Sequence, residues 1–449
     1  MKKNKKQTPF SKITLFAGAT ALMAFTPQIH AQSSVDALLN KLEQKGVLTV
    51  DEADQLKAEN AKDSAADFDK ALSSKFPMPD WVTSYKLSGD FRGRFDDQTG
   101  NDALVSRIRL RYRLRVGLQV NMKDNFQIGF SLGSDDAASA SNPTGGTPTS
   151  NNSTFLGNGS KKFIFVNTAY AKWTPIKNDD GCLSGLFGKM SQPFDVSWML
   201  FDPDYTPEGG VLQSSYKFSD SQSLRFNSGA FVLDEVSGSS RDPFMYGGQM
   251  IWDAKWTPHL ASSLGVSTFD IVKKQKVKTT YDGNSGNTLV GGAFANNFNP
   301  IIGSGSVIYT LDSFPLYNGA FPIKFAGEYM DNPGASHNNE GWNASVMFGK
   351  AGKKGNWDIS YRYQRLEADA WWDQVENDDN LAYSPVAFNG AGPGVVSGTN
   401  VKGHLIAFDY SITEALTFTF TCYVNSLINN PSPASSDAIH AMADIMWKF

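Results

Sequence analysis

Residues 107–120 read RIRLRYRLRVGLQV, with arginine at every second position from Arg107 to Arg115 and apolar or aromatic residues between them. A helix would scatter these arginines around its circumference, whereas a strand alternates its side chains between two faces and places them all on one. The stretch therefore predicts a β-strand with one strongly basic face and one apolar face.

The same alternation precedes this stretch and recurs to the C-terminus. Residues 85–95 place Arg92 and Arg94 on the polar face of an earlier strand. Further alternating segments lie near residues 126–132, 162–174, 183–191, 246–256, 323–329, 342–348, 357–363, 406–412, 416–424 and 439–449. Over the whole chain the pattern predicts about sixteen strands, each near the roughly 9–11 residues that a tilted strand needs to cross a bilayer.

The connections between these segments alternate in length. We expect tight turns at 121–125, 218–222, 257–259 and 413–414, and long polar loops around 133–160, 192–208, 272–304 and 367–402. A soluble β-sandwich has no reason to sort its loops in this way, whereas outer-membrane barrels join their strands by short turns on one side and long loops on the other. The sequence thus predicts an all-β fold, a transmembrane antiparallel β-barrel over residues 83–449, with an interior lined by polar faces and filled by water rather than by a packed core.

Two further features agree with a barrel. Trp173, Trp256, Trp357 and Trp447 fall near predicted strand ends, where aromatic girdles meet the membrane interface. The chain of 449 residues is 12% aromatic and 19% charged, which excludes a disordered chain, and its two cysteines are too few for a disulfide scaffold or a cysteine-rich metal module.

The N-terminus predicts export. Residues 1–31 are typical of a cleaved signal peptide, with a lysine-rich start, an apolar run over 13–25 and Ile29-His30-Ala31 as the cleavage site. The run is shorter than the roughly 20 residues of a spanning helix, so an uncleaved anchor is disfavoured. Loss of its five lysines leaves 36 basic and 45 acidic residues, a net charge of −9, which argues against nucleic acid as a partner.

A helical segment is expected between the leader and the barrel. Over residues 32–64, Val35, Leu38 and Leu42 follow the spacing of one helix face, and residues 65–82 form a linker with Pro77 and Pro79. Each coiled-coil-like helix is too short to be stable alone. The segment either oligomerises or contacts the envelope in the periplasm, or it packs as a hairpin on its own chain.

These features together resemble the bacterial putative porins. The resemblance is carried by Leu87–Arg94, Arg107–Gly117, Ala169–Trp173, Phe201–Gly209 and the terminal Phe449, which is similar to the last-strand signal of assembled barrels. It extends over nearly the whole chain, since signal peptide, helical segment and barrel all match. It implies an outer-membrane location, a homotrimer, and membrane lipid, ions and small hydrophilic solutes as partners.

Charged residues on the inward faces are the candidate pore-lining residues, because pore selectivity comes from charged rings and pore diameter. The basic ones are Arg92, Arg94, Arg107, Arg109, Arg111, Arg113 and Arg115, and the acidic ones are Asp195, Asp202, Asp204 and Glu208 in the loop after the fifth strand. Arginine cannot lose its proton to relieve repulsion, so counter-charges must lie nearby. We expect the loop to fold into the lumen and to set a transverse field against this arginine wall. Alternatively, the arginines only pair with acids on neighbouring strands.

The sequence predicts no catalytic residues and no cofactor. The four histidines after the leader have no nucleophile motif beside them, so a barrel hydrolase is disfavoured. Asp202, Asp204 and Glu208 supply oxygen ligands that could bind calcium, although a loop role suffices for them. The expected function is a porin for passive diffusion. An anion-preferring channel and an envelope-tethering structural barrel are the alternatives.

Overall fold

The computed structural model describes residues 79–100, 106–136, 145–238, 240–274, 286–386 and 394–449. The predicted leader, the helical segment and residues 65–78 of the linker lie outside the described residues. From Pro79 onward the chain is one unit. No helix of this described part is long and apolar enough to cross a membrane.

The strands are β1 Val82–Gly100, β2 Arg107–Met122, β3 Phe126–Asp135, β4 Ser153–Thr154, β5 Phe163–Lys177, β6 Gly181–Lys189, β7 Glu208–Ser219, β8 Gln222–Val232, β9 Phe244–Lys255, β10 Leu260–Val272, β11 Leu289–Val290, β12 Ala293–Phe294, β13 Ile301–Leu311, β14 Phe321–Asp331, β15 Glu340–Gly349, β16 Trp357–Leu366, β17 Ala382–Ser384, β18 Gly394–Val396, β19 Val401–Ser411, β20 Leu416–Leu427 and β21 Ala438–Lys448, with a short 3-10 turn, η1, at Lys123–Asn125.

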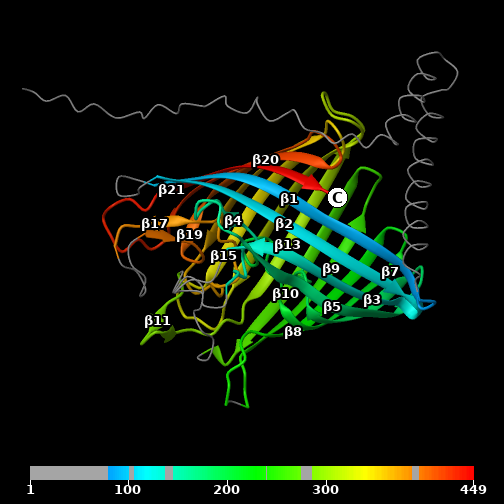
Figure 1. Ribbon diagram of the computed structural model, residues 1–449, viewed down its shortest axis with the longest axis horizontal. Coiled ribbons are helices and arrows are strands. Elements are labelled where there is room, and N and C mark those ends of the chain that lie inside the picture. The colour runs from blue at the N-terminus through cyan, green and yellow to red at the C-terminus, as the bar shows by residue number, and fades with distance from the viewer. Residues whose placement is uncertain (1–78, 101–105, 137–144, 239, 275–285, 387–393) are drawn as a thin grey trace, which may run out of the picture. The chain divides into compact units, whose positions relative to one another are not determined.

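Sixteen of these strands form one closed antiparallel barrel. Each long strand pairs with its neighbours in sequence, and β21 pairs back onto β1, where Phe91 lies opposite Trp447. Figure 1 shows this closure, with the blue β1 running beside the red β21. The short pieces β4, β11, β12, β17 and β18 belong to connections. The predicted barrel of about sixteen strands is confirmed.

The connections alternate as expected. η1 joins β2 to β3, residues 220–221 join β7 to β8, and residues 412–415 join β19 to β20. At the other end of the barrel, long connections follow β3, β6, β10 and β16 and span 136–162, 190–207, 273–300 and 367–400. Because the number of strands is even, the start of β1 and the end of β21 both lie on the side of the short turns.

The two faces of the wall differ as the alternation predicts. Apolar side chains such as Phe91, Phe95 and Leu110 are exposed on the outer surface, while Asp90, Arg94 and Asp96 between them are buried inside. The predicted tryptophans Trp173, Trp256, Trp357 and Trp447 lie at the short-turn ends of their strands, and Trp173 stacks on Phe126 with 5.5 Å between ring centroids.

One expectation about the interior is wrong. The barrel is not lined by polar faces alone, because an apolar core lies inside it toward the long loops. There the inward faces of β8 and β10 carry Phe231 and Phe269, which are 0% and 1% exposed and belong to one cluster with Phe194, Phe201 and Trp371 from the loops. The strands switch from polar to apolar side chains where loops fold in and cover them, so part of the lumen is packed rather than filled by water.

Candidate functional site

The arginines of β1 and β2 lie side by side on the inner wall. The antiparallel register places Arg92 opposite Arg113 and Arg94 opposite Arg111, with Asp90 opposite Arg115 and Asp96 opposite Arg109. Opposed side chains share a face of the sheet. The two arginine pairs therefore lie between Asp90 and Asp96, which share their inward face.

These wall acids pair with the arginines directly. Asp444 of β21 accepts two hydrogen bonds from Arg94, at 2.8 and 2.9 Å. Asp96 pairs with Arg109 at 2.8 Å and with Arg111 at 3.5 Å. Asp90 accepts hydrogen bonds from the Nε atoms of Arg113 and Arg115. The pairing of arginines with acids on neighbouring strands, which was the alternative interpretation, is therefore present.

Asp90 and Asp204 together hold Arg113 and Arg115 between the wall and a loop. The two Nε atoms donate to Asp90 at 2.9 and 2.8 Å, and the two Nη1 atoms donate to Asp204 at 3.1 and 3.0 Å. Asp204 belongs to the connection 190–207. Charge-assisted bonds of this length are the strong class of hydrogen bond in proteins, so they fix that loop against the arginine wall.

The other end of the same loop is bound to the opposite wall. The backbone N–H of Ser197 donates to Glu328 of β14 at 2.8 Å, and Asn343 of β15 donates to the Ser197 hydroxyl at 3.1 Å. β14 and β15 lie across the ring of strands from β2. The connection 190–207 therefore crosses the lumen, and we call it the crossing loop.

The crossing loop leaves the wall at a glycine. Gly188 near the end of β6 has φ +126°, and a Cβ at this position would collide with the carbonyl oxygen of Ala169. Only glycine tolerates both the backbone conformation and the close approach. The sharp departure from the strand is what directs the following residues inward.

The remaining predicted residues lie apart from this contact. Asp195 pairs with Arg225 of β8 at 3.2 Å, and Glu208 pairs with Lys189 at 3.1 Å on the exposed rim. Arg107 is exposed at the start of β2. Arg92 donates to Asn152 of the connection 136–162 at 2.7 Å. Of the four predicted loop acids, Asp204 alone has ion pairs with the arginine wall among the described residues.

A second inward loop was missed by the sequence interpretation. In the connection 367–400, Asp379 pairs with Arg94 at 3.2 Å, and its carbonyl oxygen lies 3.0 Å from the Nδ1 atom of His440. Trp371 donates its indole N–H to the carbonyl of Leu200 at 2.7 Å. Two adjacent tryptophans, Trp371 and Trp372, inside a polar acidic loop were the available signal for burial.

The two loops meet in a buried joint that is rich in carboxyl groups. The N–H of Asp202 donates to the carbonyl of Val375 at 2.7 Å, and Asp202 and Glu376 are 4% and 3% exposed. Burial, with the nearby Asp378 and Asp204 charges, raises the pKa of Asp202 well above its usual value. Burial and the charges of Asp378 and Asp373 likewise raise the pKa of Glu376. The joint is therefore most stable when these carboxyl groups are neutral.

Asp379 behaves in the opposite way. Burial alone would raise its pKa, but the charges of Arg94, His440 and Arg111 outweigh this and hold the pKa below the usual range. Asp379 is thus a carboxylate that the arginine wall stabilises, while Asp202 and Glu376 have no such compensation. The joint of the two loops therefore contains acids with a raised pKa, Asp202 and Glu376, and an acid with a lowered pKa, Asp379.

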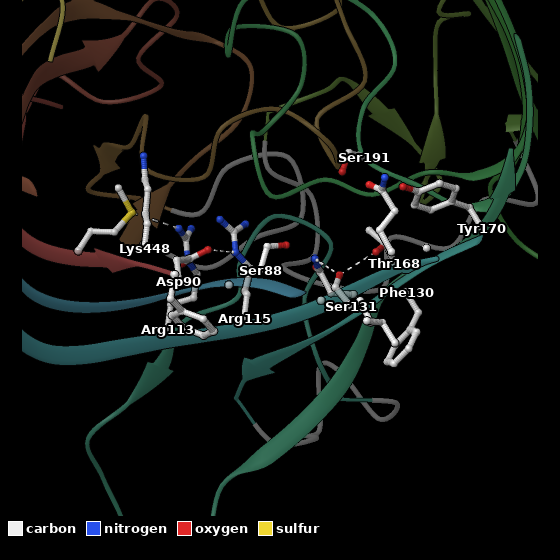
Figure 2. A pocket seen from close by; sticks show the side chains of 18 residues that line it. Ser88, Asp90, Arg113, Arg115, Phe130, Ser131, Thr168, Tyr170, Ser191 and Lys448 are labelled. Atoms are coloured by element: carbon white, nitrogen blue, oxygen red, sulfur yellow. Dashed lines mark hydrogen bonds and ion pairs between the residues drawn. The ribbon is translucent and has the colours of Figure 1, made fainter. Parts of the chain in front are cut away.

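Open space remains on both sides of the crossing loop. A cavity of about 650 Å³ lies along β1, β2, β3 and β5, and Figure 2 shows Arg113 and Arg115 rising into it beside Asp90 and Lys448. Hydroxyl groups line its far side, where Ser131 and Thr168 are joined at 2.7 Å. A second cavity of about 570 Å³ lies against β14, β15, β16 and β19. Both are lined by side chains that can contact a polar solute.

Metal binding finds no geometric support in the described ranges, where no group of three or more His, Cys, Asp or Glu side chains is placed to hold an ion. Glu208 faces Lys189 instead of closing over Asp202 and Asp204.

The fold and the site together define a class of protein, the barrel whose lumen is narrowed by an inward loop. Consistent with that class, residues 99–293 match the model of a family described as Putative porin. The match and the sixteen-stranded barrel support a porin-type channel rather than an enzyme.

Comparison with solved structures gives porins at low identity. OprB of Pseudomonas putida, in its high-pH structure, is 11% identical with a TM-score of 0.48, over 81% of this chain and 94% of that one. A triple mutant of the porin of Rh. blastica is 11% identical with a TM-score of 0.41, over 81% of this chain and 100% of that one. No curated protein matches the chain.

Proposed function

We propose that the protein is an outer-membrane porin that lets small hydrophilic solutes and ions diffuse through a water-filled lumen. The observation that carries this proposal is the crossing loop, which is tied to both walls, through Asp204 to β2 and through Ser197 to β14. A loop held across a closed barrel narrows the lumen, and one cavity remains beside the arginine wall and another against β14, β15, β16 and β19.

The outer surface supports a place in a membrane. Exposed Phe, Leu, Ile and Tyr side chains cover the outside of the strands, and Trp256 and Trp447 are 52% and 44% exposed at the short-turn end. Such an area of exposed apolar surface is unfavourable in water, and an apolar band with an aromatic girdle suits the outer membrane. Long loops on the opposite side are the pattern of the extracellular face of such barrels.

Selectivity would be set where the crossing loop meets the arginine wall. Asp204 contacts Arg113 and Arg115 directly, so the transverse field we expected between wall and loop is largely neutralised at this contact. Arg115 remains partly open to the cavity beneath, with 29% of its side chain exposed, and Lys448 has no ion pair among the described residues. These cations favour an anion-preferring channel as the more specific form of the same function.

Export and assembly are part of the proposal and rest on the sequence. Residues 1–31 would be removed as a signal peptide, residues 32–64 would form periplasmic helices, and the barrel would assemble as a homotrimer. An envelope-tethering role would be an additional property of the helical segment, tested by deleting residues 34–76 and measuring envelope attachment and solute flux separately.

The test is conductance of the purified mature protein in a planar bilayer, with the reversal potential under a salt gradient. Large ohmic steps are expected, with a reversal potential of the sign that indicates anion preference. A folded, heat-modifiable barrel that carries no current would overturn the channel proposal. Cation preference would overturn only its anion-selective form.

A further inference from the structure

The cavity against β14, β15, β16 and β19 is lined by charged residues whose pairing differs from that of the arginine wall. It has a volume of about 570 Å³ and is lined by Trp198 of the crossing loop and by charged residues of β14, β16 and β19. These strands lie apart from the arginine wall of β1 and β2, so this cavity forms a separate part of the lumen.

Arg362 of β16 is the principal cation at the loop end of this cavity. Its guanidinium carbon lies 5.8 Å from the centroid of the Trp198 ring, a cation–π distance. Its Nε and Nη1 atoms are buried and donate to no partner among the described residues. A buried guanidinium without a carboxylate is costly unless a ligand or water satisfies it.

The nearest acid on the same wall is already engaged. Glu328 accepts from the N–H of Ser197 at 2.8 Å and from the Asn343 side chain at 3.0 Å. Asp195, at the loop border of the cavity, is likewise paired with Arg225. The protein thus leaves Arg362 with unused donors while its neighbours have partners.

Acids gather at the opposite end of the same cavity. Asp358 and Asp409 face each other across the β16–β19 register, four positions along the strand from Arg362 on the same face. At about 3.3 Å per residue this separates the two ends by about 13 Å. Lys324 lines the space between them. The cavity therefore has the guanidinium donors of Arg362 near Trp198, beside a Glu328 carboxylate held by neutral donors, and a pair of acids near the short turns.

We propose that this cavity binds a solute that carries a carboxylate and an ammonium group at well-separated positions, such as a diamino acid or a short peptide. The carboxylate lies against Arg362 and the ammonium group against Asp358 and Asp409. The planar fork of arginine suits a carboxylate, and the stack on Trp198 holds that fork in place. The inference rests on the proposed channel function and names the solute class that the lumen favours.

The test measures block of the open-channel current by three molecules of equal chain length: 6-aminohexanoate, hexanoate and hexylammonium. We expect 6-aminohexanoate to halve the current at the lowest concentration. Arg362→Gln should raise that concentration about tenfold for both carboxylates, because one charged hydrogen-bonding partner is lost. Asp409→Asn should remove the preference for 6-aminohexanoate over hexanoate and leave block by hexanoate in place.

Two variants of the same strand serve as controls. Arg362→Lys keeps the charge and loses the fork, so it should weaken block while the barrel remains folded and heat-modifiable. Arg365→Gln removes an arginine that pairs with Glu367 and does not line this cavity, and it should leave block unchanged.

Equal block by hexanoate and 6-aminohexanoate, or unaltered block in Arg362→Gln, would overturn the proposed site while the channel still conducts. Absence of any current would instead count against the channel itself.

Discussion

Two walls of the same barrel differ in whether their arginines form ion pairs. On the wall formed by β1, β2 and β21, Arg94 contacts Asp444 and Asp379, and Arg113 and Arg115 share Asp90 and Asp204. On the wall formed by β14, β16 and β19, Arg362 stacks on Trp198 and has no carboxylate partner among the described residues.

The difference indicates that the charged residues of the two walls have different roles. Paired charges on the first wall anchor both inward loops, whereas an unpaired charge on the second wall is available to a solute. The number of charged side chains in a lumen therefore does not tell how many of them act on a permeating ion. What matters is whether each charge is already paired within the protein. Substitutions can test the two walls separately.

The largest effect is expected where a buried acid of the paired wall is removed. Asp96 is 0% exposed, and its carboxylate lies within 3.5 Å of Arg109, Arg111 and His440. Asp96→Ala leaves buried cations without their partner and should lower the free energy of unfolding by about 3–5 kcal/mol. Urea titration of the barrel in lipid vesicles, followed by tryptophan fluorescence, measures this.

The neighbouring residue is the matched control. Asp97 lies on the other face of β1, where its carboxylate accepts a hydrogen bond from the Thr99 hydroxyl at 3.3 Å. Asp97→Ala should change the unfolding free energy by less than about 0.5 kcal/mol. Equal effects of the two substitutions would mean that the ion pairs of the wall contribute nothing to stability.

A second prediction concerns pH and the joint of the two loops. The raised pKa values of Asp202 and Glu376 mean that the neutral carboxyl groups favour docking. This contribution is present at low pH and is lost as pH rises through the raised values. Asp379, with a lowered pKa, contributes above its unfolded value and loses that contribution only as pH falls through the lowered value.

Channel noise should therefore increase on the alkaline side as the loops separate more often. Single-channel recordings across a pH series measure it, and Asp202→Asn, which stays neutral, should reduce the alkaline increase. An alkaline response of the same size in that variant would place the titrating group elsewhere.

A third prediction is about selectivity at the crossing loop. Asp204→Asn removes the shared partner of Arg113 and Arg115 and exposes their charge to solutes. A unit charge at roughly 4 Å in water contributes about 1 kcal/mol. Its removal favours the anion and disfavours the cation by that amount each, so the anion-to-cation permeability ratio should rise by up to about thirtyfold. The reversal potential under a salt gradient reports the ratio. A ratio that stays constant would show that permeating ions do not pass this contact.

Much of the fold could be predicted because alternation is a local property of the chain. The stretch 107–120 and the last strand before Phe449 each show their two faces without reference to any other residue. The sorting of connections by length then separated a membrane barrel from a sandwich. Both inferences needed only the period of two and the loop lengths, which the structure confirms.

The pairing inside the lumen could not be predicted in the same way. Asp204 and Asp379 reach the arginine wall from loops whose paths depend on packing of Phe201, Phe269 and Trp371. Asp195 and Glu208 have the same chemistry as Asp204 but end beside Arg225 and Lys189. The composition of the loops predicted that they are acidic, but only the packing in three dimensions determines which carboxylate pairs with which arginine.

The smallest effect is expected at the rim, where a pair of the same chemistry lies in solvent. Lys189 and Glu208 are 3.1 Å apart, but 63% of the Glu208 side chain is exposed. An exposed pair contributes about 0.2–1 kcal/mol because water and salt screen it. A double-mutant cycle of Lys189→Ala and Glu208→Ala, measured by the same urea titration, should give a coupling energy in that range that falls further at high salt. A coupling as large as that of the buried Asp96 pairs would contradict the view that burial, rather than distance, separates the anchoring ion pairs from the rest.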